Sequence, residues 1–189
     1  MRTPQLSKFY PTAFVTVVVL IAVSVLALSD SFTRAKLKTQ SDKQTLEMLE
    51  EIFPDVKFYI YEEESEIYTI YDYTRNRIGY AFYAEGLGEY VEASELGEKV
   101  PGPIVILVGL EDKATIKGIF VVSHSETDIF WDLLLGKDYF SQFIRLKIED
   151  AYFRYNGGQV DGITGATLSS KLVLNTVREI ALEKVKSIR

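Results

Sequence analysis

The chain has 189 residues, of which 47% are hydrophobic and 13% aromatic, so it can form one domain of ordinary size with a packed core. Its net charge of -6 and isoelectric point near 5.0 argue against a nucleic-acid partner, because such a partner calls for a basic patch. The chain has no cysteine and a single histidine, His124, which excludes disulfides and thiolate-bound iron–sulfur clusters and leaves little for haem or a transition metal.

The first predicted element is a single transmembrane helix over residues 9–29. This stretch contains no charged residue, and residues 13–28 are nearly all Val, Ile, Leu and Ala. At 1.5 Å per residue it spans about 30 Å, the thickness of a hydrocarbon core. The alternative is a cleaved signal peptide with Ala27 and Ser29 before the cut, although the apolar stretch is longer than is usual for one. Positive charges flank both ends, so they do not favour one orientation firmly.

Residues 30–53 are expected to form a helical stalk, whose second half places Leu46, Leu49 and Phe53 on one side before Pro54. Aromatic-rich runs with β composition follow, separated by polar turns; they cover residues 56–61, 66–73 and 78–84. We interpret their tyrosines as half-buried side chains on a sheet face.

Residues 86–102, which are rich in Gly and Glu, are expected to form a long loop that faces a partner. A buried strand over residues 104–108 and a second over 115–122 predict a hairpin. A helix then closes the chain. Strands first and a helix last predict an α+β domain over residues 54–189, and no Gly-rich fingerprint of a dinucleotide-binding fold is present.

A short helix is expected after the hairpin, capped by Thr127 or Asp128 and running through Leu135, with Trp131 as a core anchor. His124 lies just before it. Because this histidine has no evident partner in the sequence, we interpret it as a loop or core residue and not as a catalytic base.

The most informative stretch is residues 161–170, Asp-Gly-Ile-Thr-Gly-Ala-Thr-Leu-Ser-Ser, which precedes an amphipathic helix expected from Leu168 to about Ile188. A helix N-terminus offers free backbone N–H groups and the positive end of the helix dipole, so it would stabilise a phosphate. Gly165 and Ala166 would let the backbone approach that phosphate closely. The alternative is an ordinary helix start with Thr164 or Thr167 as the N-cap.

At these residues the chain resembles the FMN-binding subunits of two membrane electron-transfer complexes. These are the G subunit of the Rnf ferredoxin:NAD oxidoreductase and the C subunit of the sodium-translocating NADH:quinone reductase. In that family a flavin transferase reads Asp, two variable residues, Ser or Thr, Gly, Ala, and Ser or Thr, and joins the phosphate of FMN to the last hydroxyl. The pattern is met at Asp161, Thr164, Gly165, Ala166 and Thr167. The resemblance therefore implies FMN linked through its phosphate to Thr167, followed by Leu168, with Ser169 and Ser170 contacting the phosphate oxygens.

A second point of resemblance lies at Glu126 and Thr127. Family members carry Glu-Thr there, followed by Pro-Gly and further small residues, in a loop beside the isoalloxazine ring. This chain continues with Asp-Ile-Phe-Trp over residues 128–131, so the glycine-rich part is missing. Near the ring, Glu126 would make the anionic reduced forms of the flavin less favourable.

The resemblance implies a membrane-anchored flavoprotein that relays electrons within an ion-translocating complex, and the short length favours the Rnf type. Residues 1–8 would be cytoplasmic, and the FMN domain would lie on the extracytoplasmic side of the cell (inner) membrane. Its partners would be the other membrane subunits and the flavin transferase. We expect no catalytic residue, no metal ligand and no independent activity, because the flavin does the chemistry. A stand-alone extracytoplasmic flavoprotein carrier and a flavin-free assembly subunit remain as alternatives.

Overall fold

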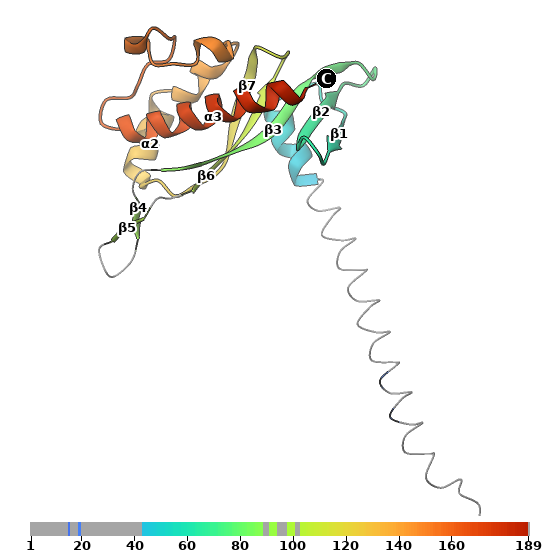
Figure 1. Ribbon diagram of the computed structural model, residues 1–189, viewed down its shortest axis with the longest axis horizontal. Helices are drawn as coiled ribbons and strands as arrows, with labels where there is room; N and C mark the ends of the chain where they lie inside the picture. Colours follow the sequence, from blue (N-terminus) through green and yellow to red (C-terminus); the bar gives the residue numbers. More distant parts are fainter. Residues whose placement is uncertain are drawn as a thin grey trace, which may run out of the picture. The chain divides into compact units, whose positions relative to one another are not determined.

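The structure, a computed structural model, describes residues 15, 19, 43–88, 91–93, 98–100 and 103–188 (Figure 1). The predicted N-terminal tail, most of the predicted membrane helix and the first part of the predicted stalk lie outside these residues. In the part of the chain that is described, no helix combines the length and the apolar character needed to cross a membrane. The chain divides into two units, residues 1–45 and 46–189, and the second contains the sheet.

A five-stranded antiparallel sheet with the order β1-β2-β3-β6-β7 forms the centre of this second unit (Figure 1). Its strands are β1 (Phe58–Glu62), β2 (Ile67–Tyr71), β3 (Arg77–Leu87), β6 (Pro103–Leu110) and β7 (Ile116–His124). The three aromatic-rich runs and the hairpin predicted from the sequence are confirmed as β1, β2, β3 and the β6–β7 pair.

The predicted long loop over residues 86–102 is wrong in part. β3 continues to Leu87, and β4 (Val91–Ala93) and β5 (Glu98–Val100) pair as a separate two-stranded ribbon. The Gly- and Glu-rich composition concealed these short strands because neither residue type favours a strand.

One face of the sheet is covered by α2 (Asp128–Gly136) and α3 (Thr167–Ser187). Alternate residues of β3, such as Phe82 and Ala84, are fully buried beneath apolar residues of α3, such as Val173 and Val177. Gly86 of β3 lets α3 approach the strand closely, since a Cβ at Gly86 would lie 2.0 Å from the Oγ1 atom of Thr176. The predicted C-terminal helix and its apolar side are therefore confirmed.

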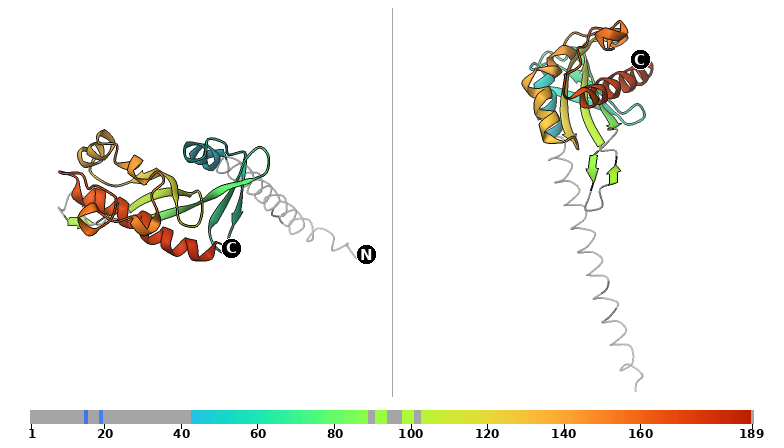
Figure 2. Two further views of the ribbon diagram at one scale, coloured as in Figure 1. Left: turned by 90° about the horizontal axis from the view of Figure 1, so that it is seen from above. Right: turned by 90° about the vertical axis from the view of Figure 1, so that its left-hand side faces the viewer.

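The opposite face is covered by the helix that residues 43–52 form, of which residues 46–52 belong to this unit (Figure 2). Leu49, Ile52 and Phe53 are buried against a second set of sheet residues that includes Ala81 and Leu107. Two of the residues predicted on the packing side, Leu49 and Phe53, are thus in the core, and Leu46 is partly buried.

Between α2 and α3 the chain makes three short 3₁₀ turns, η2 (Tyr139–Phe143), η3 (Ile148–Asp150) and η4 (Arg154–Asn156). Buried Tyr139 donates its hydroxyl to the carbonyl oxygen of Ser170 at 2.7 Å, and burial raises its pKa well above the usual value. Gln142 exchanges two hydrogen bonds with the backbone of Asp161, at 2.7 and 3.2 Å. These contacts hold the segment that leads into α3.

Candidate functional site

The turn that leads into α3 is built from small residues. Gly165 has a φ of +91°, a left-handed conformation that favours glycine. The N–H of Ala166 donates to the carbonyl of Ile163 at 3.0 Å, and the Ala166 side chain is buried. Ala166 occupies the N-cap position, so Thr167 is the first residue of the helix.

The N-terminus of α3 has no side-chain cap. The alternative interpretation, in which Thr164 or Thr167 is the N-cap, is therefore wrong, since Ala166 holds that position and offers no side-chain acceptor. The first N–H to reach a helix carbonyl is that of Ser170, which donates to Ala166 at 2.9 Å. Among the described residues, the N–H groups of Thr167, Leu168 and Ser169 have no acceptor. The side chains of Thr164, Thr167 and Leu168 are exposed.

Glu126 lies beside this helix start, between β7 and α2. Its carboxylate accepts a hydrogen bond from the hydroxyl of Ser169, which is only 2% exposed. The structure thus brings together two stretches that are 43 residues apart in the sequence and that were predicted separately to belong to one site. Thr127 is exposed and occupies the N-cap position of α2, but its side chain makes no capping hydrogen bond.

Ser170 is fully buried and ties the turn to the helix. Its hydroxyl donates to the carbonyl of Ala166 at 2.8 Å and accepts from the N–H of Ile163 at 3.1 Å. The hydroxyls of Ser169 and Ser170 are therefore committed within the fold. This differs from the expectation that they contact a phosphate.

Asp161, the first residue of the predicted pattern, forms an exposed bidentate ion pair with Arg154. The Nε–Oδ1 and Nη2–Oδ2 distances are both 2.9 Å. The hydrogen bond from Arg154 holds the pKa of Asp161 below its usual range, and the same bond raises the pKa of Arg154. Asp161 is therefore ionised at neutral pH.

An open groove of about 560 Å³ runs beside the turn that leads into α3. It is lined by Arg154, Tyr155, Val160 and by residues of the turn, among them Asp161, Thr164 and Thr167. Tyr155 is 73% exposed, and its ring stacks on that of Phe153 with centroids 5.2 Å apart. No sequence pattern indicated Arg154, Tyr155 or Gln142, because these residues lie in 3₁₀ turns that have no regular hydrophobic period.

His124 stacks on Trp131 with ring centroids 3.8 Å apart and an interplanar angle of 17°. Trp131 is 7% exposed, so its predicted role in the core is confirmed, as is the short helix that carries it. The Nδ1 atom of His124 has no hydrogen-bond partner among the described residues. Within that same part of the chain, no group of three or more His, Asp or Glu side chains could hold a metal ion.

The chain is similar to one protein-family model and to several known proteins. The family model of the FMN-binding domain matches residues 100–181. The G subunit of the ion-translocating oxidoreductase complex of Methanosarcina acetivorans is 33% identical over 184 residues, which cover 90% of this chain and 92% of that protein. The G subunit of the same complex from Shewanella piezotolerans is 26% identical, and the match covers 84% of this chain and 81% of that protein. The crystal structure of Shewanella oneidensis NqrC aligns with a TM-score of 0.45 at 17% identity, over 65% of this chain and 61% of that one.

Proposed function

This chain belongs to the family formed by the G subunits of ion-translocating oxidoreductase complexes, and from that premise we propose that it carries FMN joined through its phosphate to Thr167. It is a flavoprotein electron-transfer subunit with an FMN-binding domain. In the proposal it relays electrons within an Rnf-type ion-translocating ferredoxin:NAD oxidoreductase complex and has no separate activity of its own.

The observation that carries this proposal is the uncapped start of α3, whose first residue, Thr167, is exposed. The N–H groups of Thr167, Leu168 and Ser169 are without acceptors among the described residues, so they fit the oxygens of a phosphate. The helix dipole favours negative charge at the same place. Gly165 and Ala166 keep bulky side chains away from it. The residues present therefore fit the phosphate of FMN, with backbone donors in place of the two serine hydroxyls.

Attachment requires that Thr167 be accessible to a flavin transferase. Its exposed hydroxyl and the exposed carboxylate of Asp161 meet that requirement. In the proposed step the Thr167 oxygen bonds to the phosphorus of an FMN phosphoanhydride, the anhydride P–O bond breaks, a phosphate monoester leaves, and the hydroxyl proton passes to a base. The anhydride would be a substrate of the transferase, because free FMN would have to lose water to form the same ester.

Bound flavin supplies a ring that accepts and donates one or two electrons. The chain's own residues would hold and tune it. Tyr155 offers an exposed ring in the groove on one side of Thr167, and Glu126 is held beside the first turn of α3 by its hydrogen bond from Ser169. A carboxylate at that place disfavours the gain of negative charge nearby.

Membrane attachment completes the proposal. Residues 9–29 would anchor the chain in the inner membrane in a single pass, with the FMN domain on the extracytoplasmic side. Other membrane subunits of the complex would be its partners, in keeping with the names of its relatives. A stand-alone flavoprotein carrier would have the same attachment turn but would purify without such subunits.

The test is the intact mass of the denatured protein after coexpression with a flavin transferase, followed by peptide mapping. We expect a mass gain equal to FMN less water on the peptide that contains Thr167. An unmodified peptide from that host would contradict the proposal and favour a flavin-free assembly subunit.

A further inference from the structure

β3 is longer than its neighbour β2, so its C-terminal half forms an open edge. β2 pairs with β3 between Arg77 and Ala81, whereas β6 pairs with β3 as far as Leu87. Among the strands that the structure describes, residues 83–87 therefore pair on one side only. Alternate residues of a strand direct their N–H and C=O groups to opposite sides, so part of this backbone points away from β6. Such an edge can accept another strand.

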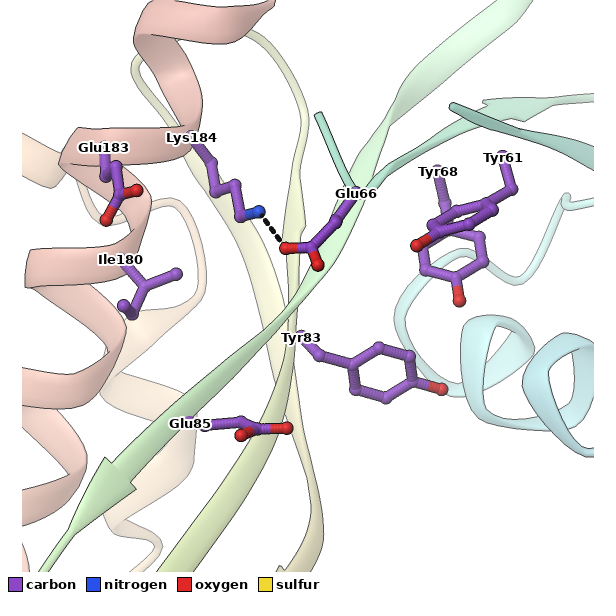
Figure 3. Close-up of a pocket in the computed structure, with 8 residues that line it drawn as sticks. All are labelled: Tyr61, Glu66, Tyr68, Tyr83, Glu85, Ile180, Glu183 and Lys184. Carbon is purple, nitrogen blue, oxygen red and sulfur yellow. Dashed lines mark hydrogen bonds and ion pairs between the residues drawn. The ribbon is translucent and has the colours of Figure 1, made fainter. Parts of the chain in front are cut away.

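A groove follows this edge, with α3 on one side of β3 and three tyrosines on the other (Figure 3). It consists of a hollow of about 390 Å³, lined by three tyrosines, Glu66 and residues of α3 (Figure 3), and an adjoining hollow of about 220 Å³. The two hollows share Glu85 and Ile180 in their linings, so they lie next to each other. The second ends at Leu168, the residue after Thr167.

The groove is acidic and aromatic. Among the described residues, its lining includes Glu66, Glu85, Glu179 and Glu183 but only two lysines, Lys171 and Lys184. Lys184 is already paired with Glu66 at 2.8 Å (Figure 3) and also donates to the carbonyl of Ser65. Glu85 and Glu183 have no hydrogen bond or ion pair within the described part of the chain.

The tyrosine rings form a connected surface at the wide end of this groove. The ring of Tyr68 lies 4.7 Å from that of Tyr61 and 5.9 Å from that of Tyr83, between centroids. Aromatic faces attract ammonium and guanidinium groups, as do the carboxylates beside them. The side chains that complement this groove are therefore those of lysine and arginine.

We propose that this groove is a docking site for an extended segment, bearing Lys or Arg side chains, of another subunit of the complex. The segment pairs with residues 83–87 as an added strand, in which backbone hydrogen bonds supply affinity and the tyrosine–glutamate end supplies specificity. The choice of a complex subunit as partner rests on the proposed function. Docking along this path brings the partner chain to Leu168, next to the proposed flavin.

The first test places a photo-crosslinking amino acid at Tyr83 in the full chain within host membranes. A matched probe at Tyr73, which is 71% exposed and lies outside the groove, serves as control. We expect the Tyr83 probe to capture a basic extended segment of another subunit and the Tyr73 probe to capture none. Capture of residues 1–42 of this chain, of a second copy, or of nothing would overturn the proposal.

The second test reverses two charges of the groove with Glu85→Lys and Glu183→Lys. The yield of the cross-link should fall about tenfold or more, because like charges in juxtaposition oppose association. The matched control, Glu111→Lys with Glu149→Lys, changes the net charge equally at exposed sites outside the groove and should leave the yield unchanged. An equal fall in both variants would overturn the proposal.

Amide hydrogen exchange distinguishes binding of the partner as an added strand from binding through side-chain contacts alone. The outward N–H groups of residues 83–87 should exchange more slowly in the purified complex than in the isolated full chain. Unchanged exchange would overturn the added strand. The flavin mass is read from the same samples: a cross-link without flavin contradicts the proposed function alone, and flavin without a cross-link contradicts the docking site alone.

Discussion

Ser169 on α3 donates its hydroxyl to the carboxylate of Glu126, which lies between β7 and α2. Since Ser169 is almost completely buried, water does not compete strongly for this bond. The bond fixes a negative charge at the positive end of the α3 dipole, two residues beyond Thr167. If Thr167 carries FMN as proposed, we expect the Glu126 carboxylate to lie close enough to act on it.

Replacing Thr167 by alanine should abolish covalent flavin without unfolding the domain. Thr167 is exposed and is not the N-cap, so Thr167→Ala should change the free energy of unfolding by less than about 0.5 kcal/mol. In-gel flavin fluorescence and a urea titration measure the two effects. Thr167→Ser is the matched control, which keeps the hydroxyl and should remain flavinylated. Covalent flavin in the alanine variant would refute Thr167 as the attachment site.

Removing the charge of Glu126 should raise the reduction potential of the bound flavin. If that charge acts on the flavin with ~1 kcal/mol, as unit charges do a few ångströms apart in water, Glu126→Gln should raise a one-electron potential by roughly 40 mV. A spectroelectrochemical titration of the flavinylated protein measures the shift. Glu149→Gln removes an exposed charge that lies outside the site and serves as control. Equal potentials in the wild type and Glu126→Gln would remove Glu126 from the flavin environment.

The hydrogen bond from Ser169 can be tested separately from the charge. Ser169→Ala removes a buried donor to a carboxylate, so the free energy of unfolding should fall by about 1–2 kcal/mol. Denaturant titration of the flavin-free protein measures this without interference from the cofactor. Leu168→Ala, an exposed change at the preceding position, should cost little. A Ser169 variant as stable as the wild type would show that the bond contributes nothing to stability.

The sequence predicted those parts of the molecule that local patterns govern. Alternating aromatic residues predicted β1 to β3. The spacing of the apolar residues predicted α3 and its buried side. The 3₁₀ turns between Tyr139 and Asn156 were not foreseen, because single long-range bonds hold them, such as that from Tyr139 to Ser170. The alternative of a threonine N-cap, which is wrong, followed from the local preference for threonine at that position. Burial of the Ala166 side chain and the two bonds of the Ser170 hydroxyl decide the position instead.

Gly165 should be the glycine of this turn least tolerant of a side chain. With its φ of +91°, Gly165→Ala forces a left-handed conformation on an L-residue, which should destabilise the fold by about 1–2 kcal/mol. The space itself is adequate, since the nearest atom to a new Cβ, Cδ1 of Leu133, lies at 3.4 Å. Gly136→Ala is the control, because a Cβ there meets nothing within 4 Å and its backbone is helical. If both variants unfold at the same urea concentration, backbone strain is not the reason for a glycine at 165.

The Asp161–Arg154 pair should affect the stability of the fold at acid pH, through the pKa of Asp161. The folded pKa of Asp161 lies below its ordinary value of 3.8, chiefly through the hydrogen bond from Arg154. A depressed carboxylate pKa adds stability above the unfolded pKa, and that stability is lost as the pH falls through the folded pKa. Because both side chains are more than half exposed, the contribution is small.

Carbon-detected NMR titration of the Asp161 carboxyl measures this pair directly. The titration should give a pKa below 3.8 in the wild type and one nearer that value in Arg154→Gln. Arg145→Gln, an exposed arginine with no ion pair in the described part of the chain, is the control and should leave the Asp161 titration where it was. An unshifted Asp161 pKa in Arg154→Gln would show that the pair does not persist in solution, and that Asp161 is free to meet the flavin transferase without first leaving Arg154.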